Sequence, residues 1–199
     1  MMRVFIIGQK WLGAEVFKAA HAAHDVAGVA APGFADRLWR TSRRAGVSRR
    51  SWKALTAADI PLCDLIVCAH AHVYVTAEMR ARAKHGAIGF HPSLLPRHRG
   101  RDAVRWAIHM GERVTGGTVY WLSDVADAGP IQCQEACHIR PDDSPTTLWR
   151  RSLAPMGFRL LTHAMAEIAS GRFVREAQDD ACATWEPSFT RRRMREGVG

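Results

Sequence analysis

The chain has 199 residues, of which 47% are apolar and 24% charged, and its formal net charge is +9. This length suits one domain with a core of its own, and the composition is that of globular proteins, which excludes disordered and fibrous classes. The longest apolar run, LIVCAHAHVYV, contains histidines and is shorter than the roughly 18–20 residues of a membrane span. The start, MMRVFII, reaches Gly8 too soon for a signal peptide, so we expect a cytoplasmic protein with no membrane partner.

The first part of the chain predicts a β-α-β unit. Residues 3–8 read as a strand, residues 14–24 have apolar positions at helical spacing, and residues 25–32 form a second apolar run. Such a unit implies a parallel sheet with a right-handed crossover. The turn GQKWLG lacks the G-x-G-x-x-G pattern of dinucleotide sites. Residues 33–58 are basic and compatible with helix, with a break at Gly46.

The middle of the chain predicts two more strands around a helix. Residues 64–72 begin as a continuous apolar run, which is typical of a central strand buried on both faces. A helix is expected next, with Thr76 as its N-cap and Gly86 at its end. The strand AIGF then ends on His91. Ligands of doubly wound sheets bind beyond the carboxyl ends of strands, so the loop after this strand is favoured for chemistry.

The last part predicts two helices, two strands and a tail. The expected elements are a helix at 101–111, strands at 114–124 and 130–140, and a helix at 144–170 that is kinked near Pro155 and Gly157. We therefore expect an α/β, Rossmann-like, doubly wound and mostly parallel sheet in one catalytic domain of residues 1–171. The C-terminal tail, residues 172–199, is expected to be frayed.

Cysteine and arginine patterns add little. The five cysteines show no repeated C-x-x-C spacing, so neither a disulfide framework nor a zinc site is indicated. Cys133 and Cys137 precede His138, yet a strand would place both on one face as small apolar side chains, and we expect no metal. The arginine clusters are scattered without aromatic interleaving, which favours a solvated basic surface over a nucleic-acid site. They lie at 43–44, 49–50, 150–151 and 191–193.

Two loops carry candidate catalytic side chains. His91 and Asp127 each follow a predicted strand, 36 positions apart. Taken alone, each signal is weak, because a histidine after a strand is more often structural and an acid before Ala-Gly-Pro is more often a turn former.

Several separated motifs, in order, resemble one family of enzymes. The motifs are FIIGQKWLGAEVF, HPSLLPRHRG, GGTVYWLSD with SDVADAGPI, and PDDSPTTLWRR, spread over residues 3 to about 170. They resemble the 10-formyltetrahydrofolate-dependent formyltransferases and are most similar to the N-terminal hydrolase domain of formyltetrahydrofolate dehydrogenase. The resemblance implies a one-carbon transferase that uses 10-formyltetrahydrofolate as the formyl donor and no metal.

The resemblance also implies roles for particular residues. His91 would hydrogen-bond the oxyanion and shuttle a proton, Asp127 would orient the imidazole, and Thr118 would supply a supporting hydroxyl. The family binds the pterin largely through backbone groups of two loops, with a leucine near the cofactor. The corresponding cofactor-binding candidates are Val73, Tyr74, Val75, Leu94, Val125 and Ala126.

The sequence departs from the family at Gly89, where Asn-x-His is usual and Gly-Phe-His stands here. Loss of an oxyanion donor costs on the order of 100-fold in rate unless another group replaces it. The dehydrogenase domain also lacks this asparagine, so the change does not by itself imply inactivity. We expect the glycine to leave room for a water molecule or a larger acceptor.

Three functions remain open at this stage. The first is formyl transfer to the amine of a small-molecule acceptor, such as an amino sugar or a hydroxamate precursor. The second is a hydrolase that uses water and releases formate and tetrahydrofolate, and the third is a non-catalytic folate-binding module. About 70 residues follow Asp127, which disfavours tRNA as a partner. Arg97, His98 and Arg99 are expected beside the entrance, facing an anionic acceptor or the folate tail, and a homodimer is left open.

Overall fold

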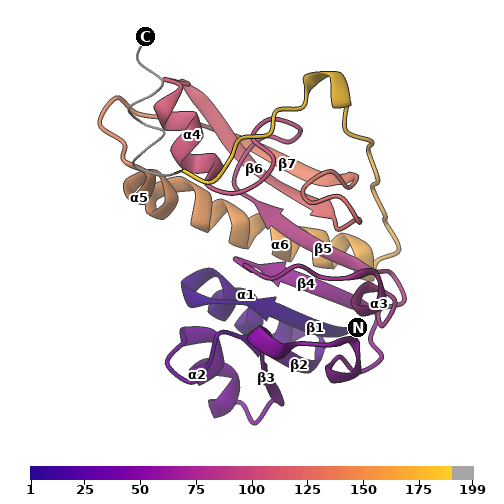
Figure 1. Cartoon of the computed structure of the whole chain (residues 1–199). Coiled ribbons are helices and arrows are strands. Elements are labelled where there is room, and N and C mark those ends of the chain that lie inside the picture. Colours follow the sequence, from indigo (N-terminus) through magenta and orange to yellow (C-terminus); the bar gives the residue numbers. More distant parts are fainter. Residues whose placement is uncertain (190–199) are drawn as a thin grey trace.

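The computed structural model describes residues 1–189, which form one mixed sheet with helices on both faces (Figure 1). Strand order is β3-β2-β1-β4-β5-β6-β7. The strands are β1 (Arg3–Gly8), β2 (Asp25–Ala31), β3 (Arg49–Ser51), β4 (Leu65–Ala69), β5 (Ala87–His91), β6 (Val114–Trp121) and β7 (Ile131–His138). The helices are α1 (Lys10–Ala23), α2 (Arg37–Arg44), α3 (Ala77–Arg80), α4 (Ala103–His109), α5 (Pro145–Leu148) and α6 (Ala154–Ala169).

The sheet changes direction at β5. Strands β1 to β5 pair in parallel, whereas β6 runs antiparallel to β5, and β7 antiparallel to β6. In this register His91, the last residue of β5, lies opposite Thr118 on β6. The predicted fold class, an α/β domain with a mostly parallel sheet, is therefore confirmed.

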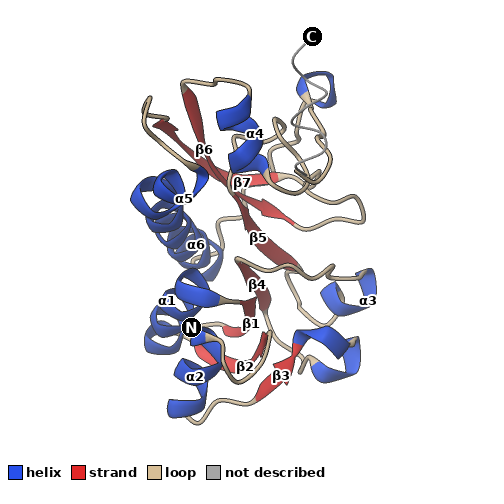
Figure 2. Cartoon of the chain, turned by 60° about the vertical axis from the view of Figure 1, so that its left-hand side comes forward, coloured by secondary structure: helices blue, strands red, loops and turns tan. Residues whose placement is uncertain are grey.

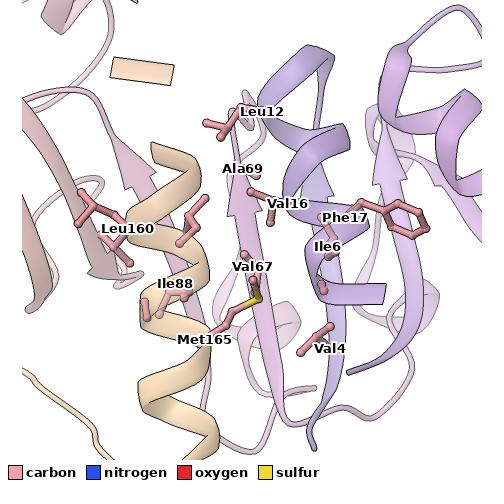
Figure 3. Close-up of a cluster of buried hydrophobic side chains, with 14 of the residues drawn as sticks. Val4, Ile6, Leu12, Val16, Phe17, Val67, Ala69, Ile88, Leu160 and Met165 are labelled. Atoms are coloured by element: carbon pink, nitrogen blue, oxygen red, sulfur yellow. The ribbon is translucent and has the colours of Figure 1, made fainter. Parts of the chain in front are cut away.

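The main core lies between the sheet and helices α1 and α6. Both helices cover the same face, as Figure 2 shows with the sheet seen nearly edge-on. Val16 from α1 and Met165 from α6 meet Val67 of β4 in this core (Figure 3). The other face is covered by α3 and two short 3-10 turns, over Ile66 and Ile7. Strand β4 is buried at every position, as expected for a central strand.

Two predicted helices are shorter than expected. After Gly46, which has φ of +72°, the chain forms β3 and 3-10 turns, because residues 49–51 pair with the exposed edge of β2. Helix α3 ends at Arg80 because the following residues bond with Cys63 and Asp64: the amide of Cys63 donates to the carbonyl of residue 82. Sheet-edge pairing thus replaces helix in both places.

The long helical region after Ser144 is irregular, as its proline indicated. Ser144 caps α5 by accepting a hydrogen bond from the amide of Thr147. A π-helical segment, η3 (Trp149–Leu153), joins α5 to α6, and Pro155 lies in the first turn of α6, where its missing amide costs no helical bond. No helix among residues 1–189 combines the length and apolarity that a bilayer crossing requires.

The tail expected to be frayed is packed from residue 172 to residue 189, and we call this segment the strap. It rises from the end of α6 and returns across β6 and β7 to α4, as the yellow trace of Figure 1 shows. Glu176 and Ile131 exchange backbone hydrogen bonds of 2.7 and 3.0 Å, and the guanidinium of Arg175 lies 3.9 Å from the Trp121 ring centroid. The arginine triplet 191–193 lies outside the described residues.

A glycine permits the close turn after the Asp127 loop. A Cβ atom at Gly129 would lie 1.7 Å from the carbonyl oxygen of Trp121, which is backbone and cannot move aside. We expect Gly129→Ala to lower the free energy of unfolding by about 3 kcal/mol or more. Gly171→Ala, at φ of +86° in open space, is the control and should lose about 1–2 kcal/mol. Equal losses in urea denaturation would contradict this account.

Candidate active site

A large open cavity lies at the carboxyl ends of β4 and β5. Its volume is about 1580 Å³, which exceeds the roughly 300–1,000 Å³ of a typical small-molecule site. The wall includes the start of α1, the loops after β4, β5 and β6, helix α4, and strap residues 185–188. This cavity therefore has room for two reactants at the edge of the sheet where doubly wound proteins bind ligands.

His91 lines this cavity with a fixed ring orientation. The side chain is nearly buried, and Nε2 donates to the carbonyl oxygen of His98 at 2.7 Å. Since a carbonyl only accepts, Nε2 carries the proton of the neutral ring, and Nδ1 is left as the free base. Nδ1 lies 3.7 Å from Oδ1 of Asp127. An imidazole held in this way can take up a proton at Nδ1 while a carboxylate stabilises the resulting cation.

Asp127 is held by two donors from different parts of the chain. Oδ1 accepts a 2.6 Å hydrogen bond from the hydroxyl of Tyr120, and Oδ2 accepts a 2.8 Å bond from the amide of Gly100. Asp127 has φ of +54°, a left-handed conformation that these contacts maintain. Burial and the adjacent carboxylate raise the pKa of Tyr120 well above its ordinary value, so its hydroxyl remains a donor.

Gln178 of the strap joins the two catalytic loops. Its Nε2 donates to the carbonyls of Asp127 and Gly129 at 2.9 and 2.7 Å. Its Oε1 accepts from Nε and Nη2 of Arg99 at 3.0 and 2.8 Å. One amide thus ties the loop after His91 to the loop that carries Asp127. Nothing local in the sequence marks Gln178, because its partners are about 50 and 80 positions away.

Thr118 and Leu94 lie beside the site and are not among the cavity-lining residues. The buried hydroxyl of Thr118 donates to the carbonyl of Ser93 at 2.7 Å and accepts from the amide of Leu95 at 3.1 Å. It therefore fastens the loop after His91. Leu94 packs toward Gly116 on β6, where its Cδ2 would lie 2.5 Å from an added Cβ. Neither side chain reaches the wall of the cavity.

The two predicted cofactor loops face the same cavity. Val73, Tyr74 and Val75 line it from the segment after β4, and Val125 and Ala126 line it from the loop before Asp127. The hydroxyl of Tyr74 donates to the carbonyl of residue 124 at 2.9 Å. The guanidinium of residue 80 donates to both loops, to the carbonyl of Val75 and the carboxylate of residue 124. The loops are therefore fixed relative to one another.

The space beside Gly89 is occupied. A Cβ there would lie 3.0 Å from Cδ1 of Leu122, 3.5 Å from Cβ of Cys68 and 3.6 Å from Cε1 of Tyr120. A Cβ at this position would therefore crowd the Leu122 side chain, and Gly89 lines the cavity together with Cys68, Tyr120 and Leu122. Tyr120 of β6 pairs with Gly89 of β5 in the sheet.

Of the basic residues expected at the entrance, His98 and Arg99 are buried and Arg97 is exposed. His98 is 1% exposed and Arg99 is 8% exposed. Arg99 forms an ion pair of 2.7 Å with Asp180 of the strap, and Arg97 pairs with Glu112. None of the three lines the cavity, so the expectation that they face an anionic acceptor or the folate tail was wrong.

His70 at the end of β4 is a neutral wall residue. Burial lowers its pKa to about 4, with further lowering by the charges of His72 and Lys10. Its ring lies 4.8 Å from the Trp149 ring centroid, and φ is +59°. The side chain therefore carries no charge near neutral pH and serves as a polar, uncharged wall.

The chain is similar in sequence to several known proteins. The family model described as "Formyl transferase" matches residues 4–164. The human cytosolic 10-formyltetrahydrofolate dehydrogenase is 32% identical over 201 residues, covering 93% of this chain and 22% of that protein. The chain thus spans about a fifth of the length of these curated relatives. Methionyl-tRNA formyltransferase of Anaeromyxobacter sp. (strain K) is 39% identical over 120 residues, covering 60% of this chain and 38% of that one.

Solved structures share the fold. Glycinamide ribonucleotide transformylase 1 from Symbiobacterium toebii superposes with a TM-score of 0.78 at 25% identity, covering 89% of this chain and 93% of that one. HypX from Aquifex aeolicus, solved in complex with tetrahydrofolic acid, gives a TM-score of 0.73 at 20% identity, covering 98% of this chain and 31% of that one. At 20% identity the second likeness concerns the fold alone.

The Gln178 contacts predict faster hydrogen exchange in a variant. Gln178→Ala removes four hydrogen bonds between the two loops, so the Gly100 amide should exchange about tenfold faster. Glu176→Ala is the matched control, because its exposed side chain has no hydrogen bond within residues 1–189. Hydrogen exchange of residues 97–103, followed by mass spectrometry, tests this prediction. Equal exchange rates in both variants would show that Gln178 does not hold the two loops together.

The lowered pKa of His70 predicts an acid-dependent loss of stability. The unfolded chain binds a proton below about pH 6.5, whereas the folded chain does so only near pH 4, so the unfolded state gains protons first. The contribution of neutral His70 to the free energy of unfolding is therefore fully present above about pH 6.5 and is lost as the pH falls to about 4. Thermal unfolding of wild type and His70→Asn should show wild type losing its advantage within this window. A pH-independent difference would be inconsistent with the burial described.

Proposed function

The chain belongs to the formyl transferase family, and on this premise we propose that it moves a formyl group from 10-formyltetrahydrofolate to the amine of a small-molecule acceptor. The observation that carries the proposal is the pair of His91 and Asp127, fixed 3.7 Å apart in the wall of a cavity large enough for both reactants. His91, Asp127 and Thr118 correspond to the catalytic positions of the family resemblance.

The proposed reaction needs a group that accepts and returns one proton. The acceptor nitrogen attacks the formyl carbon, the carbonyl electrons move to oxygen, and a tetrahedral intermediate forms. Nδ1 of neutral His91 takes the proton that the amine loses and gives it to the folate nitrogen as the carbon–nitrogen bond breaks. Asp127 stabilises the imidazolium between these steps. Once protonated, Nδ1 of His91 also donates a hydrogen bond to the oxyanion. Thr118 keeps the loop after His91 in place.

The folate donor is proposed to bind between the two apolar loops. Residues Val73 to Val75, and Val125 with Ala126, line the cavity from two separate segments. We assign recognition of the pterin to their backbone groups, because such recognition tolerates their apolar side chains. Tyr74 holds the loops together through its contact with residue 124. Leu94 lies away from this wall, so we assign it to packing of the loop after His91.

Hydrolysis to formate and tetrahydrofolate is the second candidate. It is favoured by Gly89, which supplies no side-chain amide for the formyl oxygen, and by the similarity to dehydrogenases that match over most of this chain. Here water replaces the amine, and His91 takes its proton. A non-catalytic folate-binding module is less consistent with a buried, hydrogen-bonded histidine–carboxylate pair.

One experiment distinguishes these functions. Purified protein is incubated with 10-formyltetrahydrofolate, and tetrahydrofolate release is followed without acceptor and then with D-glucosamine, ethanolamine or hydroxylamine. Release that requires an amine supports transfer, and release without one supports hydrolysis. Binding of folinic acid with no turnover in any condition supports the binding module.

The proton-transfer role predicts the behaviour of a His91 variant. His91→Ala should lower kcat by about 10²- to 10⁴-fold, because the proton acceptor for the amine or water is lost. Binding of folinic acid, measured by calorimetry, should change much less, since the donor is proposed to bind through backbone of other loops. Retention of wild-type turnover by this variant would show that the site assignment is wrong.

A further inference from the structure

Three acidic side chains line the cavity, and one of them has an unpaired oxygen. Both carboxylate oxygens of Asp127 accept hydrogen bonds. Asp102 accepts from the amide of Phe189 at 3.0 Å and lies 3.7 Å from the guanidinium of Arg105. Glu186, on the strap, is 8% exposed, and its Oε2 is buried with no hydrogen-bond partner within residues 1–189. A buried, unpaired carboxylate oxygen is costly, so a donor is expected for it.

The rest of the Glu186 side chain lies against the ring of His98. Its Oε1 lies 3.0 Å from Nδ1 of His98, although the contact lacks hydrogen-bond alignment. The carbonyl of this same residue accepts the hydrogen bond from Nε2 of His91. His98 therefore lies between the carboxylate of Glu186 and the ring of His91, which is proposed to move the proton.

A second carboxylate on His98 is neutralised, whereas Glu186 is not. Oε1 of Glu112 lies 3.0 Å from Nε2 of His98 and also pairs with the guanidinium of Arg97. Glu112 faces away from this cavity and is absent from its lining. Within residues 1–189, Glu186 has no arginine or lysine partner and shares only the His98 ring. Its negative charge is thus the less compensated of the two.

We propose that Glu186 binds the amino group of the acceptor, an inference that rests on the proposed formyl transfer. A carboxylate at this point attracts an amine that arrives as ammonium and holds its nitrogen beside the formyl donor. The ammonium first releases one proton to solvent through this carboxylate, which frees the lone pair on nitrogen. The neutral amine then attacks the formyl carbon, and His91 takes its second proton and passes it to the folate nitrogen. The terminal torsion of a carboxyl side chain is broad. A small rotation of the Glu186 carboxylate therefore turns Oε2 from its buried position toward the cavity that this residue lines. The acceptor class is therefore a primary amine that is cationic near neutral pH.

The test compares two variants at opposite sides of His98. Each protein is given 10-formyltetrahydrofolate with D-glucosamine, ethanolamine or hydroxylamine, and the ratio of formylated amine to formate is measured. Glu186→Gln should lower this ratio by about tenfold or more for the cationic amines, because a charge-assisted hydrogen bond is lost. Glu112→Gln, which removes a carboxylate from the other side of His98, should leave the ratio within about twofold of wild type.

Other outcomes overturn the inference. An unchanged ratio in Glu186→Gln means that this carboxylate does not bind the amine. An equal loss in both variants means that Glu186 acts only through His98. A wild-type chain that hydrolyses the donor and formylates no amine also overturns it, while leaving the hydrolase function intact. Should no turnover occur at all, calorimetry decides: ethanolamine must bind the wild-type protein saturated with folinic acid and fail to bind Glu186→Gln, and any other pattern counts against the inference.

Discussion

The site depends on a single carboxylate that must satisfy several partners at once. Asp127 faces His91. It accepts one hydrogen bond from the hydroxyl of Tyr120 on β6 and another from the amide of Gly100 in the loop after β5. These donors reach one point only because β6 reverses direction against β5 and brings Tyr120 opposite Gly89. The antiparallel pairing of β6 with β5 therefore brings His91, at the end of β5, and Asp127, in the loop after β6, to the same place.

Much of the fold could be predicted from local patterns in the sequence, whereas the pair of His91 and Asp127 was implied by the family resemblance. Apolar strands, a capped helix start at Thr76 and the motif around His91 are readable within a few residues. The β3 pairing and the early end of α3 could not be read, since both result from competition with distant sheet edges. The alternation along β6 did carry a signal for Tyr120, which points to the same face as Thr118, two positions earlier.

The strap was the largest difference from expectation, for a related reason. Polar and charged residues after α6 show no periodicity, and the stability of this segment comes from individual contacts with distant residues. Gln178 satisfies carbonyls of the Asp127 loop, and Glu186 lies against His98. Similarly, the close contact of Leu122 with the position of an added Cβ at Gly89 joins residues more than 30 positions apart. Long-range complementarity of this kind is invisible to composition and spacing.

The position of Gln178 also has a meaning for biosynthesis. Proteins emerge from the ribosome N-terminus first, and a domain completes its packing once its last contacting segment is available. His91 and Asp127 are both made well before residue 178, yet the hydrogen bonds that unite their loops await that residue. The nascent chain thus carries both candidate catalytic side chains for some time before the hydrogen bonds of Gln178 can form.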